Sequence, residues 1–219
     1  MTRSLKAIGL ALLTALAGAA PLTLDRPLPT AFAAERSAPD AGAFITELGD
    51  KAIGALTDKS LEPDVRRERF RTLLNEGLDI DYVGRFVLGA YRRRADERQM
   101  EEFLGLLEDN IVQNYAWRFR NYDGQQLDLL NVREGSRDTT IVETELEQAG
   151  DAPPIRVDWR VHKKDGEFKV IDIVVEGISM MVTQRDEYVG FMRSNGGVDA
   201  LIDALRKQNA ALAERYQNG

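Results

Sequence analysis

Three groups of side chains in this sequence have the types and spacing that enzyme active sites use. Gly177-Ile178-Ser179-Met180-Met181 resembles the G-x-S-x-G turn of serine hydrolases but lacks its final glycine. Asp158, Asp172 and Glu176 lie on or beside neighbouring predicted strands, and two carboxyl groups held about 5–9.5 Å apart can perform acid–base catalysis. His162 is the only histidine of the chain, so any such site would have a single imidazole.

Each of these groups also has an ordinary structural explanation. Ser179 fits the N-cap of the helix that follows, because its hydroxyl can accept a hydrogen bond from a free backbone amide. Arg156, Arg160 and Lys169 accompany the three carboxylates, which favours ion pairs across a polar sheet face. His162 falls on the polar face of its strand, where we expect a solvated side chain. A hydrolase built on Ser179 is the less favoured alternative, because hydrolases of this type place the histidine after the serine.

Motifs for bound cofactors and metals are missing from the sequence. It contains no glycine-rich phosphate loop, no His-Glu-x-x-His and no calcium-binding loop. With one histidine, no metal site that needs two imidazoles can form. The sequence therefore predicts no catalytic residue, no cofactor and no metal site, and the chain is not expected to be an enzyme.

The elements that would position these residues follow from the hydrophobic periodicity. Apolar residues at three- and four-residue spacing predict helices over 41–57, 63–77, 79–89, 96–122, 180–193 and 198–216. Alternating apolar and polar residues predict strands over 126–133, 139–147, 155–163 and 167–176, with an Asp165-Gly166 turn between the last two. This order predicts one α+β domain, a twisted, mainly antiparallel sheet of about four strands wrapped by helices.

The first 33 residues have the organisation of a secretory signal peptide. Two basic residues precede an apolar run over 8–20, which is shorter than the about 20 residues that span a bilayer. Ala31-Phe32-Ala33 predicts cleavage after residue 33, and Ala17-Gly18-Ala19 leaves an earlier site open. We therefore expect residues 1–33 to be removed on export to the periplasm and residues 34–219 to form the single domain.

The charge of the chain argues against several partners. Loss of the first 33 residues would remove three basic residues and one acidic residue, so the net charge of −7 would become −9. Nucleic acids require a basic face, and an anionic membrane repels an acidic protein. The arginines at 66–71 and 92–94 are interleaved or flanked with acidic residues. This pattern favours solvated helix faces, with a pocket rim that binds lipid phosphate as the alternative.

Cysteine is absent from the chain. The protein can therefore be neither a lipoprotein anchored through a modified cysteine nor a disulfide scaffold. Because an acidic protein is repelled by anionic bilayers, contact with membranes is expected to occur through partner proteins.

Four stretches of the sequence resemble motifs of the MlaC family, the periplasmic phospholipid-binding shuttles of the Mla (toluene-tolerance) transport system. The stretches are Arg85-Phe86-Val87-Leu88-Gly89-x-Tyr91, Tyr115-Ala116-x-Arg118-Phe119 with Tyr122-x-Gly124, Val157-Asp158-Trp159-Arg160-Val161 with the strand after it, and Gly177-Ile178-Ser179-Met180-Met181-Val182-Thr183-Gln184. The match is looser at Arg92-Arg93-Arg94, where the family more often has an aromatic residue. The four stretches together cover most of the chain beyond the leader.

The resemblance implies a binding function without chemistry. An apolar pocket between the sheet and the helices would hold phospholipid acyl chains. The protein would be a monomeric shuttle between an outer-membrane lipoprotein–porin complex and an inner-membrane Mla-type ABC transporter complex, and would maintain the lipid asymmetry of the outer membrane. A carrier of hopanoids or other lipids with the same fold stays open as an alternative.

Candidate lipid-binding residues come from two sources. The resemblance implies that Ile178 and Tyr115 line the pocket. The facing of the predicted strands and helices adds Phe119, Trp159, Val161, Ile173, Val175 and Val182. The same residues could also fill a packed core, because a core face and a cavity wall share one periodicity.

Overall fold

The computed structural model describes residues 38–58, 60–118, 125–148 and 152–218. The predicted signal peptide and the candidate Phe119 lie outside these residues. The elements in chain order are α1 (Ala38–Thr57), α2 (Pro63–Gly77), α3 (Ile80–Val87), the 3-10 helix η1 (Gly89–Arg93), α4 (Glu97–Arg118), β1 (Leu127–Glu134), β2 (Thr139–Leu146), β3 (Ile155–Lys164), β4 (Glu167–Val175), β5 (Ile178–Ser179), α5 (Met180–Asn195) and α6 (Val198–Asn218).

The sheet is an antiparallel meander with the strand order β1-β2-β3-β4-β5. The α+β class and the antiparallel sheet predicted from the sequence are confirmed. The sheet has one strand more than expected, because β5 contains only two residues and a pattern of alternation cannot be recognised over so short a segment. The helix η1 was also not predicted, because it contains only five residues after the turn at Leu88 and Gly89, too few to show a helical periodicity.

Local signals in the sequence explain the ends of the helices. Pro63 stands in the first turn of α2, where its missing amide proton costs nothing. The side chain of Asp79 accepts a hydrogen bond from the backbone amide of Tyr82 and caps α3. Gly196 ends α5 with a φ of 99°, a left-handed conformation that glycine adopts without strain and that lets the chain turn into α6.

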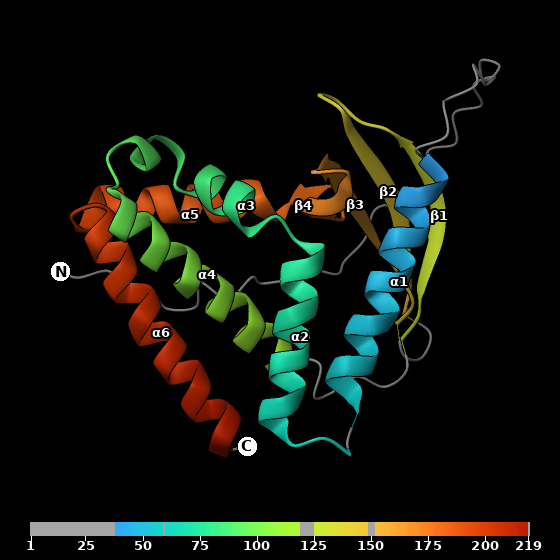
Figure 1. The fold of residues 1–219 in the computed structure, drawn as a ribbon, viewed down its shortest axis with the longest axis horizontal. Helices are drawn as coiled ribbons and strands as arrows, with labels where there is room; N and C mark the ends of the chain where they lie inside the picture. The colour runs from blue at the N-terminus through green and yellow to red at the C-terminus, as the bar shows by residue number, and fades with distance from the viewer. Residues whose placement is uncertain (1–37, 59, 119–124, 149–151, 219) are drawn as a thin grey trace.

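One hydrophobic core lies between α1 and one face of the sheet. Its buried members come from α1 and from three neighbouring strands, and they are Ala41, Ile45, Val142, Val161 and Val170. Figure 1 shows α1 lying along the sheet, with β1 and β2 behind it. These contacts arise because alternate residues of each strand point to the same face.

A second core lies among the helices. Residues of α3, α4, α5 and α6 form it, including Phe103, Tyr188 and Leu201. In Figure 1, α4 and α6 lie side by side away from the sheet, and α2 stands between α4 and α1. Phe70 of α2 packs with Val112 of α4 in a smaller cluster that joins the two parts. The fold therefore has a sheet part and a helical part, connected by α2 and by the segment from β4 to α5.

Candidate functional site

The candidate residues on β3 and β4 share one apolar face of the sheet. Trp159 pairs with Ile173 across the two strands, and the next pair along that face joins Val157 to Val175. Directly paired residues of an antiparallel sheet point to the same side. Trp159, Ile173 and Val175 therefore lie on one face, as the sequence predicts.

A register shift between Arg160 and Val161 changes the far end of this face. Val161 pairs with Val170, and not with Ile171 as strict alternation along β4 would require. Such an irregularity inserts one extra residue into β4 and cannot be recognised from alternation alone. Val161 is fully buried and packs with Ala41 and Ile45 of α1 in the core of the sheet part.

The other end of the apolar face is open. Ile178 of β5 pairs with Val175 of β4, so its side chain lies on the same face. Val175 is only 7% exposed, but Ile178 is 58% exposed, and Val182 in the first turn of α5 is 36% exposed. Isolated apolar residues are common on surfaces, but Ile178 continues a buried apolar face, and Val182 follows it four residues later in the chain. They are therefore available to a ligand.

A tight turn brings Ile178 into this position. Glu176 and Gly177 connect β4 to β5 and both have positive φ, 49° and 79°. A two-residue hairpin with positive φ at both positions matches the twist of the strands that it joins. The side chain of Glu176 also accepts a hydrogen bond of 2.6 Å from the backbone amide of Arg156.

The candidates on α4 lie in a different part of the fold. Tyr115 packs against the ring of Phe70 of α2, with 6.2 Å between the ring centroids. This places Tyr115 in the small cluster that connects the two cores. The structure thus brings Trp159, Val161, Ile173, Val175 and Ile178 onto one sheet face, with Val182 following β5, while Tyr115 belongs to the helices.

Ser179 has the capping role that the sequence predicts. Its Oγ accepts a hydrogen bond of 3.1 Å from the backbone amide of Val182 and donates one of 2.6 Å to Asp172. The imidazole of His162 is instead paired with Asp79, with 3.0 Å between Nε2 and Oδ2. The hydroxyl of Ser179 is therefore hydrogen-bonded to a carboxylate and a backbone amide.

The carboxylates of the sheet form ion pairs, as expected. Arg156 contacts Asp158 at 3.0 Å and Glu143 at 2.9 Å, and Arg160 lies 3.6 Å from Asp172 on the neighbouring strand. These groups occupy the sheet face opposite the candidate lipid-binding residues. The predicted ion pairing is confirmed for Asp158 and Asp172, whereas Glu176 and Lys169 form hydrogen bonds with backbone groups.

The expectation of a solvated His162 is wrong. Its ring is largely covered and lies 5.4 Å from the ring of Tyr82, and its Nε2 contacts the buried carboxylate of Asp79. Lys164 donates a second hydrogen bond, of 2.9 Å, to Asp79. Sequence alternation places both side chains on the polar face of β3 but cannot show that the α2–α3 connection lies over that face.

The electrostatics of this cluster keep Asp79 ionised. Burial of Asp79 acts to raise the pKa of its carboxyl group, but the hydrogen bonds from Lys164, from the Tyr82 amide and from His162 outweigh burial and lower the pKa. The same bond to Asp79 raises the pKa of Lys164. An aspartate with three donors, one of them a lysine, serves as a structural joint between α3 and β3.

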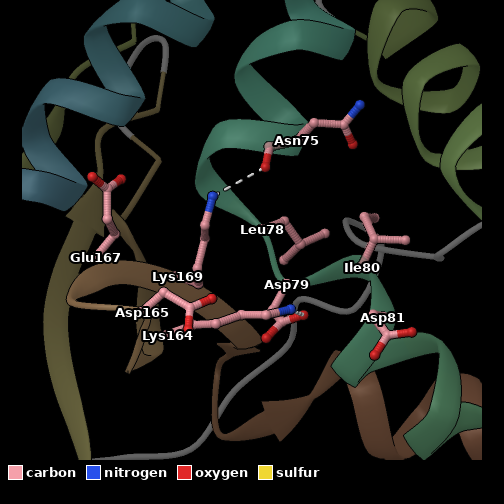
Figure 2. Close-up of a pocket in the computed structure, with 9 residues that line it drawn as sticks. All are labelled: Asn75, Leu78, Asp79, Ile80, Asp81, Lys164, Asp165, Glu167 and Lys169. Atoms are coloured by element: carbon pink, nitrogen blue, oxygen red, sulfur yellow. Dashed lines mark hydrogen bonds and ion pairs between the residues drawn. The ribbon is translucent and has the colours of Figure 1, made fainter.

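Two open depressions lie near this joint, and neither contains a candidate lipid-binding residue. The first, of about 390 Å³, is lined largely by charged side chains, among them Lys164, Asp165 and Lys169 (Figure 2). Lys169 donates a hydrogen bond of 3.2 Å to the carbonyl of Asn75, which also lines this depression. The second, of about 470 Å³, lies between α1, α2 and the turn after β3. The charged lining of the first suits water better than acyl chains, while the second has a mixed lining that includes Phe44, Leu48, Leu73 and Phe168.

The described residues contain neither a metal-binding cluster nor a membrane-spanning helix. No group of three or more histidine, aspartate or glutamate side chains in these ranges could hold a metal ion. Within the same ranges, no helix is long and apolar enough to cross a bilayer.

Comparison with known proteins agrees with the motifs and the fold. The family model "MlaC protein" matches residues 46–207. The chain is 30% identical over 149 residues to the "Intermembrane phospholipid transport system binding protein MlaC" of Haemophilus influenzae, covering 67% of this chain and 69% of that protein. It is 24% identical over 175 residues to the "Toluene tolerance protein ttg2D" of Pseudomonas putida, covering 78% of this chain and 80% of the relative.

A solved structure shares the fold. The phospholipid-binding protein from Ralstonia solanacearum, solved in complex with a phospholipid, matches with a TM-score of 0.66 over 79% of this chain and 98% of that one, at 21% identity. The family model covers far more than half of the sequence and spans both the helical part and the sheet. The chain therefore belongs to the MlaC family.

Proposed function

We propose that this chain is a periplasmic shuttle that binds phospholipid and carries it between complexes of the outer and inner membranes. The observation that carries the proposal is the exposed Ile178 at the open end of an otherwise buried apolar sheet face. Relatives named for phospholipid transport and a phospholipid complex of the same fold support the choice of ligand. In this proposal, residues 1–33 are removed on export and residues 34–219 form one domain.

The energetics of lipid transfer require an extensive apolar surface. Each methylene withdrawn from water contributes about 0.8 kcal/mol, so two acyl chains of about 15 methylenes represent about 24 kcal/mol. A carrier competes with a bilayer only if it hides nearly all of that surface. Ile178 and Val182 supply apolar surface that the protein itself leaves uncovered, next to Val175, Trp159 and Ile173. Tyr115 of α4 is proposed to contribute as well, and so is Phe119, which lies outside the described residues.

The proposed mechanism involves no covalent step. Ser179, the residue that most resembles a nucleophile, is engaged with Asp172 and with the amide of Val182, which supports a structural role. Catalysis by this serine would need an imidazole as general base. His162 is held by Asp79 through Nε2. We therefore propose that the protein binds and releases lipid unchanged.

Native mass spectrometry tests this function directly. The chain should be expressed with its leader in a bacterium, recovered from the periplasm without detergent and analysed intact. The expected result is a monomer with close to one diacyl phospholipid per chain, identified after solvent extraction. Folded monomer with only traces of lipid would refute the proposal, and extraction of a polycyclic lipid would favour the hopanoid carrier.

A further inference from the structure

We infer that Asp172 is a positioning residue for lipid binding, because it anchors the segment that presents Ile178 and Val182. This inference rests on the proposed function. The segment, residues 176–182, is called the hook below. It contains the β4–β5 turn, β5 and the start of α5.

The carboxylate of Asp172 joins the hook to β4 through two hydrogen bonds. Its Oδ2 accepts a bond of 2.6 Å from Ser179 Oγ, and its Oδ1 accepts one of 3.0 Å from the backbone amide of Met181. Ser179 Oγ in turn accepts the amide proton of Val182. One carboxylate thus satisfies, directly or through Ser179, two of the free amides at the start of α5.

Asp172 is buried in a way that makes these bonds important. Its side chain is 0% exposed, and the nearest cation is Arg160 on β3, with 3.6 Å between Nη1 and Oδ2. A buried carboxylate is unfavourable unless donors surround it. The N-terminus of α5 supplies both donors and the positive end of the helix dipole. The hook and Asp172 therefore stabilise each other.

The rest of α5 is held by other contacts. Tyr188 and Met192 are buried in the helical core, so α5 should stay docked if Asp172 is changed. Within the hook, Met181 is buried and Glu176 is hydrogen-bonded to the backbone of Arg156, but Ile178 and Val182 are exposed, so the start of α5 depends on the Asp172 bonds for its exact position. Loss of the Asp172 bonds should thus loosen the hook while the fold remains.

Two variants and a matched control test this role. Asp172→Asn removes the charge, and Ser179→Ala removes the hydroxyl that links Asp172 to Val182. Asp158→Asn is the control, because Asp158 is also ion-paired to an arginine on the polar face but does not contact the hook. Ser179→Thr keeps a hydroxyl and is the conservative rescue.

The measurements are amide hydrogen exchange of the hook and the affinity for a phosphatidylethanolamine with a fluorescent acyl chain. Because a hydrogen bond to a charged group is usually worth a factor of about ten or more, we expect both test variants to bind this lipid about tenfold more weakly. Exchange should accelerate in the hook and not in β1–β3. The Asp158→Asn and Ser179→Thr proteins should resemble the wild type.

Several results would overturn the inference. Unchanged hook exchange in both test variants would do so, as would a loosened hook with unaltered lipid affinity. Faster exchange throughout the sheet would assign Asp172 to general stability. If Asp172→Asn fails to fold, the hook exchange and lipid affinity of Ser179→Ala alone test the inference. A wild type that binds no phospholipid would refute the proposed function and the inference with it, while equal binding by wild type and both variants would refute the inference alone.

Discussion

Val175 and Ile178 face each other across the turn between β4 and β5, yet Val175 is 7% exposed and Ile178 is 58% exposed. A single pair of residues thus marks the place where the apolar sheet face stops being covered by protein. A soluble protein gains stability by covering apolar surface. The exposure of Ile178 is therefore best explained by a ligand that covers it, and the following predictions test this explanation.

Ile178→Glu should abolish lipid binding and leave the fold intact. A carboxylate at an exposed position costs little in the free protein, with an expected loss of stability below about 0.5 kcal/mol. In the complex it would lie against acyl chains without a partner, which is strongly unfavourable. Lipid content after purification and the far-ultraviolet circular dichroism spectrum are the measurements.

Leu130→Glu is the matched control for this change. Leu130 is 47% exposed and lies on β1, at the opposite edge of the sheet. Its replacement should leave the lipid content unchanged. Equal loss of lipid in both proteins would indicate a general effect of negative charge, and unfolding of Ile178→Glu would show that Ile178 belongs to the packed core.

Val161→Ala should reduce stability with little direct effect on lipid binding. Val161 is fully buried against α1, so the change removes buried methyl groups and leaves a cavity, at a cost of about 2 kcal/mol. Ile178→Ala should show the reverse, with a small loss of stability and weaker lipid binding. Urea unfolding together with lipid titration separates the two. Weaker lipid binding by Val161→Ala without loss of stability would place Val161 in the pocket wall.

Most of the fold could be predicted because its elements carry local signals. The helix that starts at Pro63, the cap at Ser179 and the Asp165-Gly166 turn all depend on neighbours in the sequence. The alternation along β3 correctly placed Trp159 and Val157 on one face. Periodicity fails for β4, where the register shift opposite Arg160 puts Val170 across from Val161.

The site was harder to predict because it depends on what covers each residue. Val161 and Ile178 have the same apolar character in the sequence, but α1 covers the first and leaves the second open. The pairing of His162 with Asp79 joins residues 83 positions apart, and nothing in the alternation of β3 indicates it. Asp172 was recognised as a member of a charged face, but its contact with the start of α5 required the structure.

Acid should weaken the joint at Asp79. Its pKa is lowered in the folded protein, so the carboxylate contributes stability above its ordinary pKa of 3.8 and loses this contribution as the pH falls through the lowered value. Asp79→Asn should therefore be less stable than the wild type at pH 7. The difference between the two free energies of unfolding should shrink below about pH 4.

Lys164→Met sharpens this test. Without the hydrogen bond and charge of Lys164, the pKa of Asp79 in the folded protein should rise toward its ordinary value, so the loss of stability on acidification should be smaller and should end at a higher pH. The urea midpoints of the wild type, Asp79→Asn and Lys164→Met should be measured between pH 3 and pH 7. The reference is the pH range in which an unperturbed aspartate titrates. If the free energies of unfolding of wild type and Asp79→Asn differ by the same amount at every pH, the lowered pKa of Asp79 would be contradicted.

Lipid should leave this protein quickly only when a partner shields the exit. Acyl chains that pass alone through water would lose most of their transfer free energy, and an exported chain with a net charge near −9 is repelled by anionic bilayers. Arg92, Arg93 and Arg94 are exposed, and within the described ranges no ion pair joins them to a carboxylate; Arg94 lies over the ring of Tyr91, and Arg92 and Arg93 can contact an acidic partner. Transfer of a fluorescent phospholipid to liposomes should thus be slow, and faster when the liposomes contain the inner-membrane transporter complex.

The double variant Arg92→Glu/Arg93→Glu should remove most of this acceleration, and added salt should reduce it in the wild type. Arg69→Glu/Arg98→Glu makes the same change of charge elsewhere and should transfer normally. Fast transfer to bare liposomes, unaffected by the transporter, would refute the partner-dependent mechanism.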